Sequence, residues 1–137
     1  MQDRPDAREL LEAVEQFLER DVVPVLEGPK QFHARVAANV MRILAREARL
    51  GDGFLRAELR RLGALLHRTD AVPETGDDVA AAVREATEQL CRRIRAGDAD
   101  AGAWRDDVLA HVRRTVEEKL EIANPRMLPQ GRRFGQE

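Results

Sequence analysis

Apolar side chains recur every three to four positions along most of this chain, which is the spacing that places them on one face of an α-helix. The pattern predicts helices at residues 6–23, 31–50, 54–67, 77–96 and 103–123. No sustained run alternates β-branched and polar residues, as a half-buried strand would. The sequence therefore predicts an all-α fold, a single-domain bundle of about five helices that are mostly antiparallel neighbours.

Glycine and proline residues mark where these helices end. Gly28-Pro29 follows the first helix, Gly51-Asp52-Gly53 separates the second from the third, and Asn124-Pro125 closes the last. We expect the Gly51 to Gly53 segment to be a tight turn between antiparallel helices. Residues 1–124 then form the helical domain, and residues 125–137 form a short basic tail.

Two charges fall inside predicted apolar faces. Glu47 lies among the apolar residues of the second helix, and Lys119 lies at the centre of the apolar arc of the last helix. Because an unpaired buried charge is costly, we expect Glu47 and Lys119 to form an ion pair across a helix contact, or each to meet another polar group.

Composition narrows the range of functions. The 23 basic and 25 acidic residues give a net charge of −2, which offers no general field for nucleic acid or an anionic membrane. No apolar run is long enough to span a bilayer, and acidic residues in the first twenty positions argue against a secretory leader. The single cysteine, Cys91, suits a reducing compartment, so we expect a cytoplasmic protein.

Catalytic patterns are poorly supported. The chain has no serine, and its three histidines, His33, His67 and His111, lie on different predicted helices without a metal-binding spacing. His33 and Glu47 would be about 21 Å apart along a helix, too far to act on one atom. We therefore expect no enzyme activity, no metal and no cofactor.

One strip of the second helix carries four arginines, Arg35, Arg42, Arg46 and Arg49. Arginine suits bidentate recognition of phosphate, so the strip could bind a nucleotide or coenzyme A, or pair with the acids of the first helix. His33 at the border of the apolar arc, Asn39 on the same helix, and Arg126 in the tail complete the candidate binding residues. The side of this helix away from its apolar arc is rich in alanine and permits close approach of another helix.

Three segments carry a resemblance to a known family: Met1-Gln-Asp-Arg-Pro5, Phe32-His-Ala-Arg-Val-Ala-Ala-Asn39 and Ala123-Asn-Pro-Arg126. From Met1 to about Leu128 the chain is similar to a family of small bacterial proteins of unknown function. The genes of that family are commonly found beside aminoglycoside-phosphotransferase-like kinases and acyl-CoA dehydrogenases. The resemblance implies a companion of such enzymes and transfers no catalytic residue.

The sequence thus favours a non-enzymatic accessory protein that binds a kinase-like phosphotransferase or an acyl-CoA dehydrogenase. We expect a homodimer that uses the second helix or its alanine-rich side. The alternative is a small-molecule module that binds acyl-CoA or a nucleotide through the arginine strip. A cavity beside His33, Asn39 and the arginines would favour the alternative, and a filled region with a broad apolar surface would favour the accessory protein.

Overall fold

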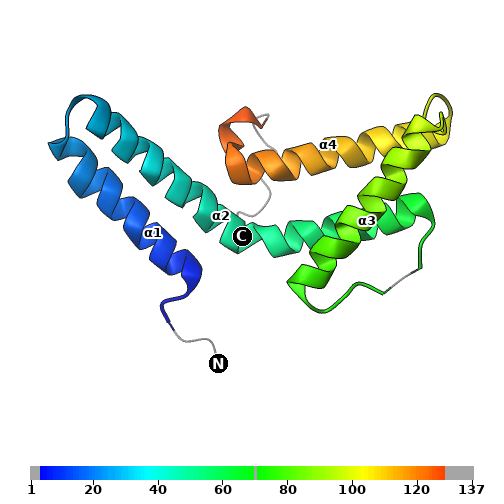
Figure 1. Ribbon diagram of the computed structural model, residues 1–137, viewed down its shortest axis with the longest axis horizontal. Coiled ribbons are helices and arrows are strands. Elements are labelled where there is room, and N and C mark those ends of the chain that lie inside the picture. Colours follow the sequence, from blue (N-terminus) through cyan, green and yellow to red (C-terminus); the bar gives the residue numbers. More distant parts are fainter. Residues whose placement is uncertain (1–3, 70, 129–137) are drawn as a thin grey trace. The chain divides into compact units, whose positions relative to one another are not determined.

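A computed structural model describes residues 4–69 and 71–128 of the chain. Its four α-helices are α1 (Ala7–Phe17), α2 (Gly28–Leu66), α3 (Gly76–Arg95) and α4 (Ala103–Ala123) (Figure 1). Short helical turns of other types occupy Leu18–Val22, Val23–Val25 and Pro125–Met127. These residues contain no strand, so the all-α prediction is confirmed. Most of the predicted basic tail lies outside the described residues.

The helix count differs from the prediction because α2 is continuous over 39 residues. Gly51, Asp52 and Gly53 do not form a turn but continue the helix. Each glycine costs about 1 kcal/mol relative to alanine inside a helix, which weakens a helix without breaking it. Asp52 also accepts a hydrogen bond of 2.8 Å from Arg56 Nε, one turn further on, which supports the helical conformation at this point.

Local sequence explains the other helix ends. Asp6 caps α1, and Glu9 reaches back to the Asp6 backbone, so that both bonds of a capping box are present at 2.8 Å. Thr75 caps α3, because its side-chain hydroxyl accepts a hydrogen bond from the Asp78 backbone N–H. At the end of α2, His67 has a left-handed backbone with φ of 55°, and the Arg68 N–H donates to the Gly63 carbonyl at 2.8 Å.

The chain divides into two compact units, which we describe separately. Unit 1 contains the described residues up to Gly51 together with Ile122–Arg126. Unit 2 begins at Asp52 and contains the second half of α2, α3 and α4 up to Glu121, with Met127 and Leu128.

Unit 1 is built on small residues. α1 runs beside the first half of α2 (Figure 1), and the buried positions in that half of α2 are Ala34, Ala38 and Ala45. Val23, in the turn between the helices, is also buried. Alanine at these positions allows close approach of neighbouring backbone, but it removes little apolar surface from water.

Unit 2 has a core of larger side chains. Its buried apolar cluster comes from the second half of α2, from α3 and from α4: Leu62, Leu65, Leu66, Ala86, Leu90 and Val108. Trp104 packs against this cluster and donates from its indole Nε1 to the Leu65 carbonyl at 3.1 Å. The Arg93 guanidinium lies 4.0 Å from the centre of the Trp104 ring, a cation–π contact.

Candidate functional site

The arginine strip of α2 makes structural contacts in unit 1. Arg42 donates to Glu15 of α1 from Nε at 3.1 Å and from Nη2 at 2.5 Å, and a second carboxylate, that of Glu19, lies 3.8 Å from the same Nη2. The pocket beside these residues measures only about 110 Å³, and Glu12 and Glu15 line it together with the arginines. Carboxylates beside the guanidinium groups oppose the binding of a phosphate there.

Arg46 stabilises the end of α4. Its Nε donates to the Ile122 carbonyl at 2.6 Å and its Nη2 to the Ala123 carbonyl at 3.5 Å. The last carbonyls of a helix have no partner within the helix and carry partial negative charge, so a cation is favourable there. Partial burial, and after it the positive charges of Arg42 and Arg49, lower the pKa of Arg46 from its ordinary value.

The remaining predicted binding residues do not gather around a cavity. His33, Arg35 and Asn39 are exposed on α2, and the His33 ring lies 5.8 Å from the ring of Phe32. Arg126 is exposed in the turn Pro125–Met127. The pockets of about 110, 350 and 420 Å³ are lined by other residues.

The two charges predicted to be buried are exposed. Glu47 lies on the exposed side of α2 in unit 1, and Lys119 is exposed on α4 in unit 2. The expectation of burial is therefore wrong, because the large apolar face that surrounds Glu47 points to solvent and the buried side of α2 is the alanine side. An ion pair between Glu47 and Lys119 stays a prediction.

The residue that precedes Lys119 on α4, Glu118, is a buried charge, with an accessible fraction of 3%. Both of its carboxylate oxygens accept from Arg61 of α2, Oε1 from Nη1 at 3.0 Å and Oε2 from Nη2 at 2.6 Å. Arg114 Nε donates to the same carboxylate at 2.9 Å. Two guanidinium groups thus compensate the desolvated carboxylate, and this polar cluster holds α4 against α2 inside unit 2.

His111 lies beside this cluster and is also buried. Desolvation and the charge of Arg61 lower its pKa, and the carboxylates of Glu58 and Glu118 oppose the shift less strongly. His111 Nδ1 is buried without a hydrogen-bond partner. Between its lowered pKa and the ordinary pKa of histidine, this ring stays neutral in the folded chain, whereas the unfolded chain binds a proton.

Sequence reasoning missed this cluster. A signal was present on α4, since His111, Glu118 and Glu121 are spaced by seven and three residues and share one helix face. The apolar residues Leu109, Val112 and Val116 define the opposite side and drew attention to Lys119. The sequence pattern alone did not reveal that the side with Leu109, Val112 and Val116 is the exposed side of α4.

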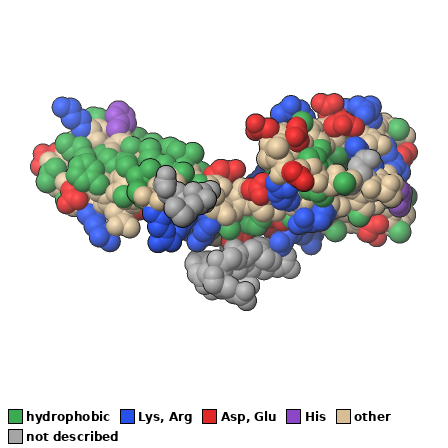
Figure 2. Space-filling view, turned by 90° about the horizontal axis from the view of Figure 1, so that it is seen from below, with side chains coloured by type: hydrophobic (Ala, Val, Ile, Leu, Met, Phe, Trp, Pro, Cys, Tyr) green, Lys and Arg blue, Asp and Glu red, His purple; other side chains and the backbone are tan. Residues whose placement is uncertain are grey.

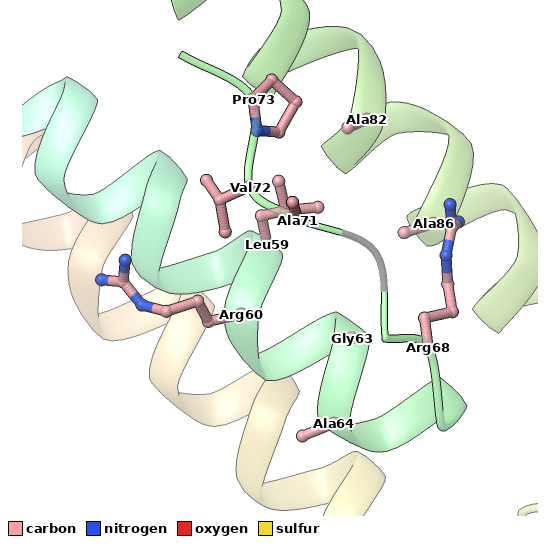
Figure 3. A pocket seen from close by; sticks show the side chains of 10 residues that line it. All are labelled: Leu59, Arg60, Gly63, Ala64, Arg68, Ala71, Val72, Pro73, Ala82 and Ala86. Carbon is pink, nitrogen blue, oxygen red and sulfur yellow. The ribbon is translucent and has the colours of Figure 1, made fainter.

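The cavity of unit 2 is mainly apolar. It measures about 350 Å³ and lies between α2, α3 and the loop that joins them (Figure 3). Leu59, Ala71 and Val72 lie together near its middle, with Pro73 above them in the view, and Arg60 and Arg68 stand on opposite sides. Arg68 is already bound to Glu85, with Nη1 and Oε1 3.3 Å apart. A second, more open hollow of about 420 Å³ lies beside Arg61, Asp107 and His111.

The described residues contain neither a metal-binding cluster nor a membrane-spanning helix. Across residues 4–69 and 71–128, no three histidine, cysteine or carboxylate side chains are grouped so as to hold a metal ion. Among the helices described, none is long and apolar enough to cross a membrane.

Fold and contacts define an all-α protein in which Arg42 and Arg61 pair with carboxylates of neighbouring helices. The chain belongs to the family described as Domain of unknown function (DUF6285), which matches residues 24–127. The match covers most of the described residues of both units. No curated protein and no solved structure matches the chain.

Proposed function

We propose that this chain is a non-enzymatic accessory protein that binds a partner protein through exposed apolar side chains. The observation that carries the proposal is that small side chains are buried in unit 1 while larger apolar side chains are exposed. Alanines fill the inside of unit 1, whereas large apolar residues of α1 and α2 lie outside. A large contiguous apolar surface is typical of a protein-binding site.

A second exposed apolar set lies on α4 in unit 2. Leu109, Val112 and Val116 have accessible fractions of 52%, 45% and 49% and share one side of the helix, which we call the α4 stripe. We propose that the α4 stripe contacts the partner enzyme. The sequence resemblance supplies the candidates, a phosphotransferase-like kinase or an acyl-CoA dehydrogenase, and the lone cysteine supports a cytoplasmic setting.

The experiment is affinity capture of the tagged chain from its native cell, followed by mass spectrometry of the bound proteins. Val112→Glu places a charge in the α4 stripe and should abolish recovery of the enzyme. Ala81→Glu is the matched control, because it adds the same carboxylate at an exposed position of α3. Recovery of neither enzyme by the wild-type chain, or equal recovery by Val112→Glu and wild type, would overturn the proposal.

The cavity of unit 2 favours a second candidate, the binding of a small molecule. Its apolar middle and the exposed Arg60 at its rim suit an acyl group that ends in an anion. The arginine strip is the weaker site, since Arg42 and Arg46 are engaged and the pocket beside them is small. Mass spectrometry of a ligand retained by the purified chain tests this candidate, and Gly63→Leu, which fills the cavity, should release such a ligand.

A further inference from the structure

The exposed apolar residues of unit 1 form a surface that we call the hairpin face. Figure 2 shows hydrophobic side chains gathered over the part of the molecule that carries α1 and the first half of α2. The accessible fractions of these residues range from 42% to 63%; they are Leu10, Val14, Phe17, Phe32, Val36, Val40 and Leu44. No buried residue lies on α1 itself. The two helices therefore leave most of their large apolar side chains uncovered.

The size of this surface fits a stable protein interface. An aromatic side chain has about 150–250 Å² of surface and valine and leucine have less, so seven such side chains that are about half exposed offer on the order of 600 Å². A standard interface buries about 800 Å² on each partner. A partner with a matching apolar face is needed to cover it.

The charged and titratable groups on the same side of α2 are arranged symmetrically. His33 precedes Val40 by seven residues and Glu47 follows it by seven. At 1.5 Å per residue, each lies about 10 Å from Val40 along the helix axis. Both side chains are exposed, and both lie within about 20° of Val40 around an ideal helix.

We propose that a second copy of this chain covers the hairpin face, with two α2 helices antiparallel about a two-fold axis beside Val40. In that arrangement a position that precedes Val40 lies opposite the position that follows it by the same number. His33 then meets the partner's Glu47, and Val36 lies beside the partner's Leu44. The inference rests on the proposed function, since it names the first partner that the accessory protein binds.

Self-complementarity is the reason for choosing a second copy. A carboxylate inside an apolar interface is costly unless a donor lies opposite to it. The chain supplies that donor at the position that two-fold symmetry requires, because an imidazole N–H can donate to the carboxylate. The contact forms twice in the dimer, as in any isologous interface.

The first test measures the mass of the purified full chain by sedimentation equilibrium over a range of concentrations. We expect the wild-type chain to be a dimer. Val40→Glu brings two carboxylates together at the axis and should raise the dimer dissociation constant by about 100-fold or more. Gln16→Glu is the matched control, since it adds one carboxylate to unit 1 at an exposed position away from the hairpin face, and it should remain a dimer.

The second test places a carboxylate at position 33 and a basic side chain at position 47. His33→Glu places two carboxylates opposite each other, and Glu47→Lys places a lysine opposite His33. Each should raise the dissociation constant about tenfold. The double variant restores opposite charges and should recover affinity close to that of the wild type, an outcome that simple loss of folding would not produce.

Other results would overturn the inference. A wild-type chain that stays monomeric at every concentration excludes the second copy. A dimer that resists Val40→Glu uses another surface, and additive losses in the double variant exclude the pairing of His33 with Glu47. None of these measurements contains the partner enzyme, so a failure here leaves enzyme capture through the α4 stripe intact, and the converse also holds.

Discussion

Units 1 and 2 both contain part of α2, yet they bury different kinds of side chain. In unit 2 the helix turns Leu62, Leu65 and Leu66 inward. In unit 1 the same helix turns alanines inward and leaves Val36 and Leu44 at the surface. Burial of leucine removes far more apolar area from water than burial of alanine, so the two units rely on different sources of stability.

This contrast separates two uses of an amphipathic pattern. Unit 2 buries its apolar pattern within the chain and builds a core. Unit 1 brings its helices together through small residues and through ion pairs such as Arg42 with Glu15, and it keeps the large residues available. An apolar helix face can therefore mark a core or an interface, and the size of the residues on the opposite face distinguishes the two cases here.

The largest expected effect comes from truncating the core of unit 2. Leu62 is fully buried, so Leu62→Ala should lower the free energy of unfolding by about 3 kcal/mol, the sum of lost burial and a cavity. Leu44→Ala makes the same chemical change on the hairpin face, where the accessible fraction is 42%. We expect it to cost less than about 1 kcal/mol in a chain held monomeric by Val40→Glu. Denaturant unfolding of the two variants measures both losses in the free energy of unfolding. Equal losses would contradict the contrast between the two units.

Enlarging an alanine tests the close approach inside unit 1. Ala38 has no accessible surface, so Ala38→Leu should destabilise the chain by about 2 kcal/mol through overpacking. The control, Ala81→Leu, makes the same enlargement at an exposed position of α3 and should be nearly neutral. Thermal unfolding reports both variants. A neutral Ala38→Leu would mean that unit 1 is loosely packed.

A smaller and opposite effect is expected at the end of α2. His67 holds a left-handed backbone that glycine adopts without steric cost, so His67→Gly should stabilise the chain by about 0.5–1 kcal/mol. Thr69→Gly places the same residue two positions later, where the backbone is not left-handed, and should not stabilise. Denaturant unfolding of the pair tests whether the gain comes from the backbone of residue 67.

The smallest effect concerns pH and unit 2. The pKa of buried His111 is lowered, so below about pH 6.5 the unfolded chain binds a proton that the folded chain does not. Stability should therefore fall as the pH drops from 7 toward 5.5. His111→Gln should flatten this dependence. Unfolding curves measured across this pH range test the prediction. If stability depends on pH as steeply in His111→Gln as in the wild type, His111 is not the source of the dependence.

Local signals in the sequence were sufficient for several elements. The predicted helix at residues 103–123 coincides with α4, and α3 differs from its prediction by one residue at each end. Leu62, Leu65 and Leu66 recur at helical spacing and are buried in the core of unit 2. These predictions succeeded because helix propensity, capping and termination act over a few neighbouring residues.

Two predictions needed information that local sequence does not carry. Gly51 and Gly53 lower helix propensity, but whether a helix breaks there depends on contacts such as those of Arg56 with Asp52 and with the carbonyls of Pro73 and Glu74. The choice of the buried side of α2 was equally open, since burial of either its alanine side or its large apolar side would remove apolar surface from water. The pairing of Arg61 with Glu118, 57 residues apart, has no local signature.

The contact of Arg46 with the end of α4 has a consequence for synthesis of the chain. Arg46 donates to carbonyls 76 and 77 residues further along, so a ribosome makes the donor long before the acceptors. During that interval α1 and the first half of α2 have left the ribosome, but unit 1 lacks Ile122–Arg126. Early chains would therefore carry the hairpin face before the unit that bears it is complete, and neighbouring nascent chains on one messenger could meet through it.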